Sequence, residues 1–306
     1  MSSETARSEQ SDQPVSGSEQ PPSQQFEIDE NTSLSDLTPS QLIYLNQNAL
    51  NDLIPQRPLI EDVEPISLLR AEYESGSANF LKQIDWLSAQ GFRHLRRARG
   101  DGDCFYRALG FAFIEQILQA SEKDIAVASA LSLLDVTLDL LEAVGFQKIV
   151  YEDFYEELCN VITKIFPPDS SQQPLTSDGL MEIFQLQDPP VSNCIVAYLR
   201  LLTSAQLRLN EDEYLPFLFH PELGELMPDV RAFCENFVEG SGKEADHVQM
   251  TALCTVLRLN LKVAYLDGRM GTVDFVEFRN DLTTDEHIML LYRPGHYDIL
   301  IKDSSS

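Results

Sequence analysis

The sequence has 306 residues, of which 43% are hydrophobic, and its 49 acidic against 22 basic residues give a formal net charge of −27. This length and apolar content suffice for a large hydrophobic core, while no stretch reaches the roughly 18 apolar residues that a membrane span requires, and the N-terminus lacks the apolar run of a secretory signal. We therefore expect a soluble, unexported protein that binds neither membranes nor nucleic acid, because its charge repels anionic lipid and phosphate.

The first 59 residues divide into two segments. Residues 1–37 are rich in Ser, Gln, Glu and Pro and are predicted to be a disordered acidic and polar tail. Residues 38–59 are predicted to form a capped helix and a linker, with Thr38 as N-cap and Pro55 as the stop. The apolar stripe of this helix either packs on its own domain or serves as an arm that contacts a protein partner.

From residue 60 onward the hydrophobic period indicates an α+β fold. Apolar residues recur at helical spacing through most of this region. The helical segments are 66–75, 78–90, 104–119, 122–144, 151–165, 177–187, 192–204, 229–238 and 246–258. The last fifth changes to strand-like patterns near 259–267, 272–278, 287–293 and 297–301. We expect many helices packed on a small, mainly antiparallel sheet near the C-terminus, in one domain over 60–303.

An arginine-rich run, "RHLRRAR" at residues 93–99, precedes the most informative loop. It is typical of a solvated strand or loop edge. The alternative is a local positive field beside a functional site.

The stretch "RGDGDCFYRALGF" sets Cys104 at the start of a predicted helix. Gly100 and Gly102 permit a tight loop with inward N–H groups, and Asp103 is a suitable N-cap. A helix N-terminus lowers the pKa of a thiol, and its free N–H groups can form an oxyanion hole. From this stretch alone, Cys104 is either a reactive thiol or a buried core residue behind a turn.

A second stretch, "LLYRPGHYDIL", offers a partner for that thiol. His296 follows a Pro-Gly turn, and Asp298 lies on the same face if the chain is extended. The carboxylate can then hold one ring nitrogen while the other faces a nucleophile, as a Cys-His-Asp triad requires. The other four histidines are predicted to be structural or superficial: His94, His220, His247 and His287.

Together, "GDGDCFYRA" and "LLYRPGHYDIL" resemble the otubains, which are cysteine deubiquitinases of the ovarian-tumour (OTU) class, over roughly residues 60–302. The resemblance implies a papain-like OTU fold. It makes Cys104 the nucleophile, His296 the general base and acid, Asp298 the residue that orients the histidine, and Asp101 the loop residue that shapes the oxyanion site, with Gly102 and Asp103 in the same loop.

The implied reaction is hydrolysis of isopeptide bonds in ubiquitin chains, with a preference for the main proteasome-targeting chain type. The implied partners are ubiquitin, polyubiquitin and ubiquitin-conjugating enzymes, and helices near 180–245 would hold the distal ubiquitin. One alternative is a protein that binds and restrains conjugating enzymes, with or without hydrolysis. Another is a papain-like peptidase of general specificity.

The residue before the nucleophile departs from the family pattern, because otubains commonly have Asn where Asp103 stands. Asp caps a helix about as well as Asn. Its charge is expected to disfavour the thiolate by about 1 kcal/mol at partly exposed separations.

The remaining cysteines are Cys159, Cys194, Cys234 and Cys254, and they are predicted to be inert core thiols. An odd number of cysteines without a C-x-x-C pair argues against disulfides and zinc knuckles. We expect a reducing, cytoplasmic or also nuclear location. No cofactor and no metal ion are expected, because no metal-ligand spacing or phosphate-binding loop occurs.

Overall fold

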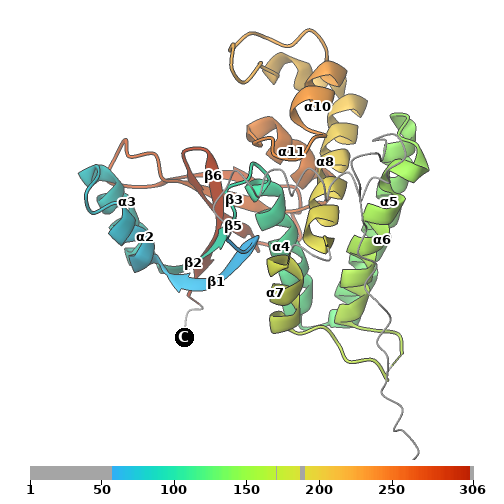
Figure 1. Cartoon of the computed structure of the whole chain (residues 1–306), viewed down its shortest axis with the longest axis horizontal. Helices are drawn as coiled ribbons and strands as arrows, with labels where there is room; N and C mark the ends of the chain where they lie inside the picture. Colours follow the sequence, from blue (N-terminus) through green and yellow to red (C-terminus); the bar gives the residue numbers. More distant parts are fainter. Residues whose placement is uncertain (1–56, 170, 187–189, 304–306) are drawn as a thin grey trace, which may run out of the picture. The chain divides into compact units, whose positions relative to one another are not determined.

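In the computed structural model, a six-stranded sheet in the order β1-β2-β6-β5-β3-β4 forms the centre of the fold (Figure 1). The structure describes residues 57–169, 171–186 and 190–303. The strands are β1 Ile60–Pro65, β2 Phe92–Ala98, β3 Leu261–Tyr265, β4 Asp274–Phe278, β5 Ile288–Arg293 and β6 His296–Lys302. Neighbours are antiparallel except β3 and β5, which are parallel.

Helices cover both faces of this sheet (Figure 1). The helices are α2 Ile66–Glu72, α3 Ala78–Ala89, α4 Cys104–Gln119, α5 Lys123–Ala143, α6 Lys148–Ile165, α7 Ser177–Gln185, α8 Val191–Leu209, α9 Glu211–Tyr214, the 3-10 turn η2 Leu215–Phe217, α10 Val230–Phe237 and α11 His247–Val256. Leu69 of α2 and Leu87 of α3 pack on Leu95 of β2 and Leu300 of β6 on one face. The other face packs on α4.

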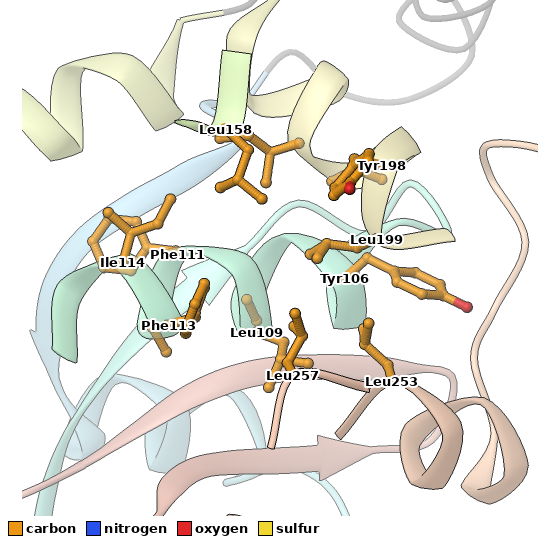
Figure 2. Packing of buried hydrophobic residues seen from close by; sticks show 14 of the residues in the cluster. Tyr106, Leu109, Phe111, Phe113, Ile114, Leu158, Tyr198, Leu199, Leu253 and Leu257 are labelled. Carbon is orange, nitrogen blue, oxygen red and sulfur yellow. The ribbon is translucent and has the colours of Figure 1, made fainter. Parts of the chain in front are cut away.

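Helix α4 is the centre of the larger core, because it is buried on almost every side. Its apolar side chains contact the sheet on one side and α6, α8 and the end of α11 on the others, and Figure 2 shows how they interdigitate. Phe111 of α4 stacks edge to face on Phe184 of α7, with ring centroids 5.2 Å apart. Gly110 allows α8 to approach closely, because a Cβ there would lie 3.1 Å from Leu199. This packing fixes the start of α4, where Cys104 lies.

The α+β architecture predicted from the sequence is confirmed, but the sheet is larger than expected. Strands β1 and β2 come from before the helical region, and β2 pairs with β6 across about 200 residues of sequence. The arginine-rich run lies largely in β2, and the expectation of a solvated edge is wrong for its second half, because Arg96, Arg97 and Arg99 are buried. Arg96 packs over the ring of Phe111, which replaces the lost hydration.

The predicted disordered tail over 1–37 lies outside the described residues, as does almost all of the capped segment over 38–59. Within the part of the chain that the structure describes, no helix has the length and apolar character needed to cross a membrane.

Candidate active site

Cys104 is the first residue of α4, as predicted, and its side chain is buried at the end of a tight loop. Gly102 has a φ of +80° in this loop. A Cβ at this position would overlap the backbone of Gly242, in the segment between α10 and α11. Only glycine at position 102 therefore allows the cysteine loop and the Gly242 segment to lie against each other.

The carboxylate of Asp101 fixes the cysteine loop through two hydrogen bonds. Its Oδ1 accepts from Nη1 of Arg107 at 2.8 Å and from the backbone N–H of Asp103 at 3.0 Å. Burial raises the pKa of Asp101, but the attraction of Arg107 outweighs it and the pKa lies below its ordinary value. The N–H of Asp103 is thus already engaged in this structure. The N–H groups at the start of α4, beginning with that of Cys104, have no partner within the helix and are the available donors for an oxyanion.

Asp103 makes a different interaction from the one predicted. It occupies the N-cap position, but its side chain makes no capping hydrogen bond. Its Oδ1 instead accepts from Nε of Arg200 at 2.9 Å and from the backbone N–H of Gly242 at 3.0 Å. Arg200 also donates to the backbone carbonyls of Gly102, Val238 and Lys243.

This Asp103–Arg200 pair corrects the expected cost to the thiolate. Both side chains are almost completely buried, and α8 places the guanidinium directly beneath the cysteine loop. The positive charge of Arg200 compensates the negative charge of Asp103 at close range, so the carboxylate is not a free charge beside the sulfur. The pair also ties the cysteine loop to the Gly242 segment.

His296 and Asp298 meet on one face of β6, as the strand alternation predicts. Nε2 of His296 donates to Oδ1 of Asp298 at 2.8 Å. The same oxygen accepts from the backbone N–H of Ala98 at 3.1 Å, and Oδ2 accepts from Nη2 of Arg293 at 2.9 Å. Burial raises the pKa of Asp298, but these partners outweigh it and keep the pKa below its ordinary value. The buried carboxylate is therefore held ionised and oriented.

The second ring nitrogen of His296 is left for the thiol. Burial lowers the pKa of His296, but the interactions with Asp298 and with Cys104 outweigh burial. The pKa therefore lies above its ordinary value, at about 9. Gly100 contributes by its small size, because a Cβ there would lie 3.6 Å from Nδ1 of the ring. The structure thus brings Cys104, His296 and Asp298 together, and a larger side chain at position 100 would extend over the imidazole.

The arginines that support these residues were not identified as site residues from the sequence. Arg107 and Arg200 are completely buried, and Arg293 is mostly buried. A signal was present, because Arg107 and Arg200 stand within apolar helical stretches, "CFYRALGF" and "AYLRLLT". A charged residue at such a position is buried only with a partner.

The remaining cysteines and histidines lie apart from this site. Burial raises the pKa of Cys234 to about 12, which agrees with an inert thiol. The ring of His247 stacks on Tyr265, and His287 bonds to Glu277. Among the described residues, no group of three or more His, Cys, Asp or Glu side chains is arranged to hold a metal ion.

Comparison with known proteins gives the same family as the two motifs. The family model described as Peptidase C65 Otubain matches residues 52–302. The chain is 33% identical over 260 residues to an ovarian tumour domain-containing deubiquitinating enzyme 1 of Arabidopsis thaliana, covering 79% of this chain and 80% of that protein. It is 32% identical over 254 residues to the human ubiquitin thioesterase OTUB1, covering 82% and 86%.

Solved structures agree with this assignment. A structure described as h/ceOTUB1-ubiquitin aldehyde-UBC13~Ub superposes with a TM-score of 0.72 at 27% identity, covering 86% of this chain and 98% of that chain. A similar complex with UBCH5B~Ub gives a TM-score of 0.71 at 29% identity, with the same coverage. The chain belongs to the otubain family of cysteine peptidases.

Proposed function

We propose that this protein hydrolyses the isopeptide bond between the C-terminal glycine of ubiquitin and a lysine side chain, through Cys104, His296 and Asp298. The observation that carries the proposal is the 2.8 Å hydrogen bond from His296 to Asp298, which leaves the other imidazole nitrogen for the thiol at the start of α4. Relatives named as ubiquitin thioesterases and deubiquitinating enzymes support the choice of substrate.

The roles follow from the geometry. The Cys104 thiolate attacks the carbonyl carbon, and the N–H groups at the start of α4 stabilise the resulting oxyanion. His296 gives its proton to the lysine nitrogen as the C–N bond breaks, which leaves a thioester. It then takes a proton from water, whose oxygen attacks the thioester and releases the carboxylate and Cys104. Asp298 orients the ring, and Asp101 and Asp103 hold the loop that carries the cysteine.

An exposed apolar patch supports the placement of the distal ubiquitin near residues 180–245. Phe217, Phe219, Leu223 and Leu226 lie between α9 and α10, and each side chain is more than half exposed. Exposed apolar clusters of this kind mark protein–protein contacts. The preference for the main proteasome-targeting chain type stays a prediction from the resemblance, and the cytoplasmic or also nuclear location stays a prediction from the cysteine pattern.

Binding of a ubiquitin-conjugating enzyme is a second candidate function. The solved structures similar to this chain include complexes of OTUB1 with UBC13~Ub and with UBCH5B~Ub. We propose that this chain also binds such enzymes. Because these related structures contain ubiquitin, they argue against the alternative function of a peptidase with general specificity.

The test uses the full chain with diubiquitins of each linkage. We expect conversion to monoubiquitin, fastest for the main proteasome-targeting linkage, together with covalent labelling by a ubiquitin whose C-terminus carries a thiol-reactive group. Binding to a conjugating enzyme charged with ubiquitin is measured in parallel. Binding without cleavage of any diubiquitin would contradict the hydrolytic proposal and leave the binding function.

The pH dependence should report the pairing of His296 with Asp298. The raised pKa of His296 means that the imidazolium form predominates in the folded protein up to about pH 9 and is lost as the pH rises through that value. Turnover should therefore decline as the pH rises through about 9. In Asp298→Asn, burial dominates and this decline should move to lower pH by about one unit or more. An unchanged profile of rate against pH would show that Asp298 does not act through the histidine.

A further inference from the structure

Helix α2 ends with Glu72, an acid on the face of the helix that packs on the sheet. Ile66 and Leu69 precede it at three-residue spacing and are buried in the core that also contains Leu95 of β2 and Leu300 of β6. Residues three apart lie on one face of a helix, so this spacing directs the Glu72 side chain toward the sheet. The side chain is 46% exposed and therefore lies at the rim of this core.

Each carboxylate oxygen of Glu72 contacts a different arginine. Oε1 lies 2.6 Å from Nη2 of Arg97 on β2. Oε2 accepts from Nη1 of Arg293, the last residue of β5, at 3.5 Å. The side chain of Arg97 is 8% exposed and also bonds to Glu64 of β1, so the first oxygen of Glu72 is held by a group that is itself fixed. One carboxylate thus joins two arginines from different strands.

Arg293 links Glu72 to the candidate triad. Its Nε and Nη2 both donate to Oδ2 of Asp298, at 3.1 and 2.9 Å. Because both bonds end on a single oxygen, they leave the guanidinium free to turn about that oxygen. Arg293 also lines an open cavity of about 440 Å³ beside His296, which gives a long side chain room for other rotamers. The bond from Nη1 to Glu72 restricts this rotation, because it fixes the guanidinium at a second point.

The orientation of Arg293 matters because the side chain of Asp298 is completely buried. A buried carboxylate stays ionised only with hydrogen bonds and a nearby cation. If Arg293 turned away, Oδ2 of Asp298 would lose both bonds to the guanidinium, and the carboxylate would hold Nε2 of His296 in a less defined position. Alternating charges therefore connect the end of α2 with the imidazole, in the order Glu72, Arg293, Asp298 and His296.

We propose that Glu72 is a positioning residue for the hydrolysis, because it holds Arg293 in the orientation that keeps Asp298 fixed on His296. This inference rests on the proposed function. Among the described residues, the ion pairs of Glu72 are with arginines and not with the triad, so it acts on the imidazole only through Arg293. Its effect should therefore fall on the chemical step and not on the binding of substrate.

The test is steady-state hydrolysis of diubiquitin by the full chain, with kcat expressed per site titrated by the thiol-reactive ubiquitin. Glu72→Gln should lower kcat roughly threefold to fivefold and leave KM unchanged, because the ion pair it removes is partly solvated. Arg293→Gln removes the group through which Glu72 acts and should lower kcat more, by roughly tenfold. Adding Glu72→Gln to Arg293→Gln should then cause no further loss of kcat. Where Arg293→Gln does not fold, Arg293→Lys replaces it, because a single ammonium lacks the guanidinium's fork of donors.

The matched control is Glu74→Gln, which removes the same charge two residues further along, from an exposed side chain that pairs with Arg70. It should keep the wild-type kcat, because Glu74 does not hold Arg293. An unchanged kcat in Glu72→Gln, or a rise in KM alone, would overturn this inference and leave the proposed function intact. An undiminished loss on adding Glu72→Gln to the Arg293 variant would also overturn it. Failure of the wild type to cleave any diubiquitin would overturn the proposed function and this inference with it.

Discussion

Cys104→Ser is expected to abolish isopeptide hydrolysis, with kcat reduced on the order of 10⁴-fold or more. A hydroxyl in place of the thiol is not ionised beside His296 and is a much weaker nucleophile. The fold should survive, because serine is close in size to cysteine and the loop is held by Asp101 and Asp103 rather than by the sulfur. The measurement is the rate of diubiquitin cleavage, with circular dichroism and thermal unfolding to show that the variant is folded.

The matched control for this experiment is Cys159→Ser, which changes a half-buried cysteine on α6, outside the site. Burial raises the pKa of Cys159, so this thiol is not primed for attack. We expect Cys159→Ser to retain wild-type turnover and labelling by the thiol-reactive ubiquitin. Turnover by Cys104→Ser above about one hundredth of the wild-type rate would assign the chemistry to another group.

The sequence was most informative where one local signal determines one element. The turn before Cys104 and the long apolar helix after it correctly predicted the start of α4. The region of β2 was expected to be a solvated strand or loop edge, and its burial was not predicted, because that burial depends on elements far away in the sequence. Its arginines look solvated in isolation, and they become buried when β2 pairs with β6 and receives partners such as Phe111 and Glu64 from other elements.

The candidate site also combines features that the local sequence predicts with features that depend on tertiary packing. His296 and Asp298 lie two residues apart, so strand alternation alone predicts that their side chains meet. The partner of Asp103 lies 97 residues away on α8, and only the packing of α8 against α4 brings Arg200 beneath the cysteine loop. The sequence could therefore indicate the reacting groups, whereas the charges that hold them depend on tertiary packing.

The second large effect is expected on stability, from Arg200→Met. Methionine fills most of the volume of the arginine, but it removes the closest cation from the buried carboxylate of Asp103 and leaves Arg107, whose Nη2 lies 4.0 Å from Oδ2. It also removes the donors to the carbonyls of Gly102 and Lys243. Breaking a buried ion pair on one side costs about 3–5 kcal/mol. We expect a loss of this size in the free energy of unfolding, measured by urea denaturation.

Two further variants separate the lost charge balance from lost packing. Arg208→Met removes a less buried arginine from the same helix and should cost less, about 1 kcal/mol, because Glu239 stays partly solvated.

The double variant Asp103→Asn with Arg200→Met removes both charges, so it should be more stable than Arg200→Met alone. If the double variant is no more stable, the stabilisation comes from the packing of Arg200 on Tyr106, where the guanidinium lies 4.3 Å from the ring centre. A gain on adding Asp103→Asn would instead show that the acidic residue before the nucleophile is tolerated because Arg200 compensates its charge.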